Sequence, residues 1–171
     1  CSIATTSGQE SIGAIKVPDG FHALFDGKDL NGWRGGSTFD HRKFLSFTEE
    51  ERQKQMTEWT ADMLEHWSIE GDELVNDGKG RYATTIKDYG DFELLIDYKT
   101  VPKADSGIYL KGAPQVQIWD YTDPSKFGIG GNKGSGGLWN NSKGAKGKDP
   151  LVLADKKLGK WNSFRIRQVG A

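Results

Sequence analysis

The stretch Ala104–Asp120, with the sequence ADSGIYLKGAPQVQIWD, holds the side chains whose types and spacing best fit chemistry on a ligand. It predicts two short strands joined by a Gly-Ala-Pro turn, and successive side chains of a strand point to opposite faces. One face is apolar and consists of Ile108, Leu110, Val116 and Ile118. The other is polar and aromatic and consists of Tyr109, Lys111, Gln115, Gln117 and Trp119. Amides and a lysine hydrogen-bond sugar hydroxyls and aromatic faces pack on C–H bonds, so this face predicts carbohydrate binding. An ordinary solvated sheet face is the alternative.

Two carboxylates stand at the ends of this predicted hairpin. Asp105 ends the turn before the first strand, and Asp120 directly follows Trp119. Either carboxylate fits a general base or an anchor for a sugar hydroxyl. Either also fits a turn cap, which is the commoner role of aspartate.

The segment Lys126–Lys148 is rich in glycine and lysine around a single tryptophan, Trp139. It lacks the Gly-Lys-Ser/Thr signature of a phosphate-binding loop, and no apolar helix follows it. A long loop inside a compact domain is more often functional or disordered than incidental, and a tryptophan gains by burial. We therefore expect the loop to be ordered around Trp139 and to border the polar face of the hairpin, with a mobile surface loop as the alternative.

Several classes of protein are disfavoured by the rest of the chain. His22, His41 and His66 lack the spacing of a metal site or a catalytic triad, and neither a Gly-x-Ser-x-Gly elbow nor a Rossmann fingerprint occurs. The net charge of −1 gives no reason to expect a nucleic acid as partner. No apolar run approaches the roughly 18 residues of a membrane span, so no transmembrane segment is expected.

Short alternating runs between glycine-rich turns predict that most of the chain is β-structure. The longest run is Asp91–Thr100, where alternation puts Phe92 and Tyr98 on one side and Asp97 on the other. Further strands are expected at Phe21–Phe25, Trp67–Glu70, Glu73–Asn76, Tyr82–Thr85 and Trp161–Val169. Many short strands of this kind indicate an all-β fold, either a sandwich or a jelly roll.

The segment Thr48–Glu65 is expected to be the one helix, inserted between the predicted strands. Thr48 and Glu51 match a capping box. Met56, Trp59 and Met63 recur at helical spacing, and we expect this apolar stripe to pack onto the sheet.

The 171 residues are expected to form one β-sandwich domain over residues 20–171, preceded by a polar tail or tether over residues 1–19. The only cysteine is Cys1, so the sequence offers neither a disulfide nor a cysteine-based metal site. A chain that starts Cys-Ser is similar to a mature bacterial lipoprotein, which would carry a lipid anchor on Cys1. A fragment boundary is the alternative.

Four stretches together resemble the 3-keto-disaccharide hydrolase family, also described as 3-keto-glucoside 1,2-lyase and 3-keto-2-hydroxy-glucal hydratase. They are GFHALFDGKDLNGWRG at Gly20–Gly35, YGDFELLIDYKT at Tyr89–Thr100, the hairpin ADSGIYLKGAPQVQIWD, and KWNSFRIR at Lys160–Arg167. The similar family patterns are G-F-x-x-L-F-D-G-K-x-L-x-G-W, Y-G-D-F-E-L, N-S-G-I-Y-L-R-G…E-V-Q-I-x-D and W-N-x-F. The matches run from about Gly20 to the last residue.

The resemblance implies a concanavalin A-like antiparallel β-sandwich with sugar on its concave sheet, in a bacterial protein that is secreted or held in the periplasm or cell envelope. Three positions depart from the family pattern: Asp105 stands where Asn is common, Lys111 where Arg is common, and Gln115 where Glu is common. If that Glu is the base in relatives, its replacement moves the chemistry to an aspartate. Such domains usually continue past the W-N-x-F strand, so the sandwich is expected to be incomplete at the C-terminus.

The resulting expectation is an enzyme that eliminates or hydrolyses 3-keto-glycosides. A carboxylate, Asp105 or Asp120, would remove the C2 proton that the ketone acidifies, and Lys111 would stabilise the enolate. The substrate-binding residues would be Tyr109, Gln115, Gln117, Trp119 and Trp139. A divalent metal could supply the electrophile, although no compact ligand motif indicates one. The alternatives are a non-catalytic carbohydrate-binding module of the same fold and an envelope structural domain.

Overall fold

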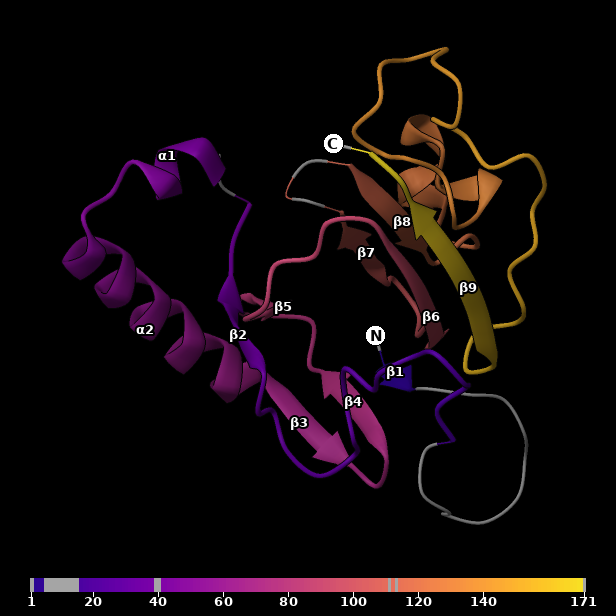
Figure 1. Ribbon diagram of the computed structural model, residues 1–171. Helices are drawn as coiled ribbons and strands as arrows, with labels where there is room; N and C mark the ends of the chain where they lie inside the picture. Colours follow the sequence, from indigo (N-terminus) through magenta and orange to yellow (C-terminus); the bar gives the residue numbers. More distant parts are fainter. Residues whose placement is uncertain (1, 5–15, 39–40, 111, 113, 171) are drawn as a thin grey trace. The chain divides into compact units, whose positions relative to one another are not determined.

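The computed structural model describes residues 2–4, 16–38, 41–110, 112 and 114–170, and strands predominate in it (Figure 1). The strands are β1 Ser2–Ala4, β2 Trp33–Gly36, β3 Trp67–Glu70, β4 Glu73–Asn76, β5 Tyr82–Thr85, β6 Phe92–Lys99, β7 Asp105–Tyr109, β8 Gln115–Trp119 and β9 Trp161–Gln168. The helices are α1 His41–Leu45 and α2 Glu49–His66, with short 3-10 helices η1 Pro124–Ile129 and η2 Gly131–Lys133. The expected strand-rich class is confirmed, and the sandwich arrangement stays a prediction.

The chain divides into two compact units. One comprises Tyr98–Phe164, and the other comprises Ser2–Asp97 together with the chain from Arg165 onward. Strands β3, β4, β1, β6 and β9 follow one another in a five-stranded sheet, while β2 pairs with β5 and β7 pairs with β8 in two-stranded sheets. Each of the two small sheets lies within one unit, and β7–β8 belongs to the unit that carries the predicted site residues.

Most of the predicted strands lie where the sequence places them, because alternation and turn residues are local signals. The β3–β4 hairpin has the predicted bounds, and Gly71 in its turn has a φ of 68°, which favours glycine. The prediction of a strand at Phe21–Phe25 was wrong. One turn closes just before this segment, where the Phe21 amide donates to the Pro18 carbonyl, and the Asp26 turn follows directly after it. The segment between the two turns pairs with no strand in the described part of the chain.

Asp97, which alternation puts on the opposite side of the strand from Phe92 and Tyr98, is buried. Strand β6 is an interior strand of the five-stranded sheet, between β1 and β9. The alternation therefore separates the two faces of β6 but does not reveal that the second face is covered at this position. At the chain's start, Ser2–Ala4 pairs antiparallel with β4, with Ser2 opposite Val75.

Helix α2 confirms the predicted capping box and apolar stripe. The Glu51 amide donates to the Thr48 hydroxyl at 3.2 Å, and the Thr48 amide donates to the Glu51 carboxylate at 2.8 Å. Trp59 and Met63 are buried. The helix lies along β2, where the Gly35 amide donates to the Thr60 hydroxyl at 3.0 Å (Figure 1). The short helix α1 was not predicted.

The capping box gives a stability prediction. Thr48→Ala removes the hydroxyl that accepts from the Glu51 amide, and we expect it to lower the free energy of unfolding by about 1 kcal/mol. Urea denaturation followed by circular dichroism measures the change. Thr57→Ala, on the exposed side of the same helix, is the matched control and should be neutral or slightly stabilising because alanine has the higher helix propensity. Equal losses in both variants would contradict the capping assignment.

Candidate functional site

The hairpin of β7 and β8 forms the base of the candidate site. Its register pairs Asp105 with Trp119, Gly107 with Gln117 and Tyr109 with Gln115, so these residues share one face as predicted. The opposite face carries an apolar cluster in which Leu110, Val116 and Ile118 are buried and Ile108 is half-buried. The predicted division of the hairpin into two faces is therefore present in the structure.

Gly107 explains how the polar face is packed. A Cβ at this position would lie 2.4 Å from the side-chain nitrogen of Gln115 and 2.8 Å from the Val116 carbonyl oxygen. The Gln115 side chain therefore lies over Gly107, along the hairpin.

The glycine-rich segment after η2 pairs with the outer edge of β8. The Gly136 amide donates to the Gln117 carbonyl at 2.8 Å, the Gln117 amide to the Gly137 carbonyl at 2.9 Å, and the Trp139 amide to the Gln115 carbonyl at 2.9 Å. Glycine is required at 137, since a Cβ there would lie 2.5 Å from the Lys148 carbonyl oxygen. The predicted ordering of the loop beside the polar hairpin face is confirmed, with Trp139 half-buried.

Ser135 fixes the start of this edge pairing. Its hydroxyl accepts from the Trp119 amide at 3.0 Å and donates to Asp155 at 2.5 Å, and its amide donates to the other Asp155 oxygen at 2.8 Å. Tyr98 is buried beside Ser135. Burial raises the pKa of Tyr98 to about 12, and the hydrogen bond to Ser135 acts in the opposite direction. Trp119 is thus held by its backbone as well as by its ring.

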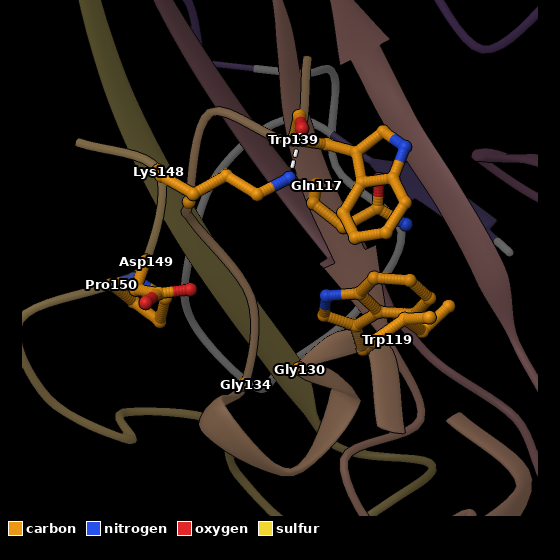
Figure 2. Close-up of a pocket in the computed structure, with 10 residues that line it drawn as sticks. Gln117, Trp119, Gly130, Gly134, Trp139, Lys148, Asp149 and Pro150 are labelled. Carbon is orange, nitrogen blue, oxygen red and sulfur yellow. Dashed lines mark hydrogen bonds between the residues drawn. The ribbon is translucent and has the colours of Figure 1, made fainter. Parts of the chain in front are cut away.

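A small pocket opens between this loop and β8 (Figure 2). It is lined by Gln117, Trp119, Ile129, Gly130, Gly134, Gly137, Trp139, Lys148, Asp149 and Pro150. The Trp119 and Trp139 rings meet edge to face, with centroids 5.3 Å apart. The enclosed space between these side chains has room for about one water molecule, so the pocket does not enclose a whole sugar.

Asp105 joins the buried amide of Gln117 to the ammonium of Lys126. Gln117 is 2% exposed and its amide donates to one Asp105 oxygen at 2.9 Å, while Lys126 donates to the other at 2.6 Å. The hydrogen bond and negative charge of Asp105 raise the pKa of Lys126. The Lys126 ammonium also lies 6.0 Å from the Trp119 ring centroid. A partly exposed carboxylate, a cation and an aromatic ring therefore meet at one end of the polar face.

Asp120 has a different environment from Asp105. It is 4% exposed, and its carboxylate accepts from the Lys103 amide at 2.8 Å, the Thr122 amide at 2.9 Å and the Thr122 hydroxyl at 2.6 Å. Burial opposes ionisation of this group, but the three hydrogen bonds outweigh it and lower the pKa of Asp120. Asp120 is not among the described residues that line the pocket, and its contacts are those of a turn cap.

Two lysines that the sequence did not single out lie beside the polar face. Lys126 contacts Asp105, and Lys148 extends over the Trp139 ring with its ammonium 3.9 Å from the ring centroid (Figure 2). Both belong to the glycine-rich and lysine-rich loop, but nothing in the spacing distinguishes them from its other lysines. The predicted enolate partner Lys111 lies outside the described residues, so its role stays a prediction.

Neither a metal cluster nor a membrane-spanning helix is found in the described part of the chain. No group of three or more His, Cys, Asp and Glu side chains there is placed to hold a metal ion. No helix there combines the length and the apolar composition that crossing a bilayer requires.

The contacts of Asp120 predict a structural role that depends on pH. Asp120→Asn replaces one carboxylate oxygen by an NH₂ group, which would face the N–H of Lys103 or of Thr122 instead of accepting from it. We expect this to lower the free energy of unfolding by about 1–3 kcal/mol at pH 7. Because the folded pKa lies below the unfolded value, the carboxylate stabilises the fold above about pH 4 and loses this contribution as the pH falls through the folded pKa.

Urea denaturation at pH 7 and pH 3 measures this effect, and the gap between the native protein and Asp120→Asn should narrow at pH 3. Asp123→Asn is the matched control, since Asp123 caps η1 with one bond to the Ser125 amide and should cost less. A stability of Asp120→Asn equal to that of the native protein at pH 7 would contradict the capping role.

A comparison with known protein families covers the chain from residue 20 to residue 171. No curated protein and no solved structure matches it. Residues 20–171 match the model of one family, described as the 3-keto-alpha-glucoside-1,2-lyase-like domain. This range includes the β7–β8 hairpin, the glycine-rich loop and every site residue described above. The chain therefore belongs to the 3-keto-alpha-glucoside-1,2-lyase-like family, as the resemblance of its four motifs predicted.

Proposed function

We propose that this domain cleaves 3-keto-glycosides by elimination, with Asp105 as the base. The ketone at C3 acidifies the hydrogen at C2, and the Asp105 carboxylate takes that proton. The C–H electron pair becomes the C2=C3 bond of an enolate. When the ketone reforms, that pair becomes a C1=C2 bond and the C1–O bond breaks. The proton held by Asp105 is then available to the departing oxygen, and addition of water to the double bond would complete a net hydrolysis.

The observation that carries this proposal is the 2.6 Å contact between the Asp105 carboxylate and the Lys126 ammonium. The C2 hydrogen and the C3 oxygen of the substrate are on neighbouring carbons, so a base and a cation must lie side by side to serve both. Lys126 would leave its ion pair as Asp105 becomes neutral and would balance the charge on the enolate oxygen. The side chain of Asp105 is 44% exposed, which gives a substrate access to it.

The surrounding side chains fit a role in holding the sugar. The Gln117 amide fixes the orientation of Asp105, and the half-buried Trp139 ring offers apolar surface for sugar C–H bonds. The Trp119 ring is 4% exposed and packs edge to face against Trp139. Asp120 is less suited as a base, because its carboxylate is buried and already accepts three hydrogen bonds. The family match supports a 3-keto sugar as substrate, and Asp105 is assigned to the reaction by its contacts alone.

A non-catalytic carbohydrate-binding module is the second candidate. It is favoured by the fact that both oxygens of Asp105 have side-chain partners, Gln117 and Lys126, as in a carboxylate that only holds its neighbours in place. The two candidates differ in turnover and not in sugar binding, so kinetics separates them.

The base assignment predicts a loss of rate without an equal loss of binding. Asp105→Asn should lower the rate of aglycone release from a nitrophenyl 3-keto-glucoside about 100-fold or more. The parent glucoside should not be cleaved, since its C2 hydrogen is weakly acidic and ordinary hydrolysis generally needs two carboxyl groups roughly 5–10 Å apart on one bond.

Asp123→Asn is the control for this measurement, because it removes a carboxylate of the same unit that caps η1. Retained activity in Asp105→Asn would reject Asp105 as the base. Equal cleavage of the 3-keto-glucoside and its parent would reject elimination, and binding without cleavage of either would favour the binding module.

A further inference from the structure

A positively charged side chain, that of Lys148, lines the small pocket beside β8. It is anchored by a hydrogen bond to the Trp139 carbonyl and lies 3.9 Å from the centroid of the Trp139 ring (Figure 2). Lys148 is half-buried, and in the described part of the chain no carboxylate lies within ion-pair distance of its ammonium. An ammonium has three donors, and the Trp139 carbonyl takes only one of them.

The charges around this ammonium do not offset it. Asp149 also lines the pocket, but its carboxylate is paired with Lys133 at 2.5 Å. Over residues 126–160 the chain has eight lysines and two aspartates, although its net charge as a whole is −1. The segment that surrounds the pocket is therefore strongly positive, which raises the local concentration of anionic ligands.

The pocket is small and partly open to solvent, so a ligand group that meets Lys148 would lie at its mouth. Gln117 links the two ends of the face, since it lines the pocket and also bonds Asp105. A single ligand that reaches both Lys148 and Asp105 would therefore lie across Gln117.

We propose that the substrate carries an anionic group, a carboxylate or a sulfate, on the part next to the reacting sugar, and that Lys148 binds it at the mouth of this pocket. The identity of the reacting sugar rests on the proposed function. The anionic group rests on three observations: Lys148 has no carboxylate partner among the described residues, the Trp139 ring lies beside its ammonium, and the segment around them is positive. Charge-assisted hydrogen bonds are about twice as strong as neutral ones, so this group would dominate recognition.

The test measures binding with ligands that lack the ketone, so that turnover does not interfere. Calorimetry with the native protein compares glucosyl-glucose, glucosyl-glucuronate and glucosyl-glucose 6-sulfate at low and high salt. At least one anionic ligand should bind about tenfold or more tightly than the neutral one, with the preference shrinking at high salt. The stronger of the two anionic ligands identifies the group.

Variants locate the effect at Lys148. Lys148→Met should abolish the preference for the anionic ligand and Lys148→Arg should retain it, while Lys146→Met removes an exposed lysine two residues away and should change nothing. Thermal melts confirm that each variant folds. Equal binding of all three ligands, or a preference that survives in Lys148→Met, would overturn the proposal.

Turnover of the corresponding 3-keto forms separates this inference from the proposed function. If the anionic ligands bind with the expected Lys148 dependence but no 3-keto form is cleaved, the elimination fails and the anionic subsite stands. If all 3-keto forms are cleaved with equal efficiency, the elimination stands and the subsite fails.

Discussion

The candidate site depends on the pairing between the outer edge of β8 and the glycine-rich segment around Ser135–Trp139. Without it, β8 would leave its backbone donors and acceptors unpaired on one side, and Trp139 would have no reason to meet Trp119. Glycine makes the approach possible, because Gly137 lies against the Lys148 carbonyl with no room for a side chain. One stretch of backbone hydrogen bonds therefore builds the pocket wall and positions Lys148.

The two aspartates of the hairpin illustrate how environment divides the roles of identical side chains. Asp120 accepts bonds from backbone amides and a hydroxyl in a buried turn, which favours a fixed carboxylate. Asp105 stands partly exposed at the start of β7, and its partners Gln117 and Lys126 are side chains. Side-chain partners can exchange for substrate atoms more readily than a backbone turn can, which is why Asp105 fits chemistry and Asp120 fits stability.

The polar face separates into two ends with different chemistry. At one end Asp105 and Lys126 bring opposite charges together, as proton transfer next to a carbonyl requires. At the other end Lys148 lies on the Trp139 ring without a carboxylate partner in the described part of the chain. Gln117 is buried between these two ends, where it lines the pocket and donates a hydrogen bond to Asp105. The proposed reaction and the proposed recognition therefore use different cations of one loop.

The features that depend on neighbours in the chain could be predicted from the sequence. Alternation and turn residues predicted β3, β4 and the two faces of the β7–β8 hairpin, and the Thr48–Glu51 spacing predicted the start of α2. Only the folded structure reveals the burial of Gln117 and Asp97, the bond from the Lys103 amide to Asp120, and the choice of Lys126 and Lys148 from a loop with many lysines. These features arise where segments that are far apart in the chain meet, and periodicity within one segment carries no information about what covers it.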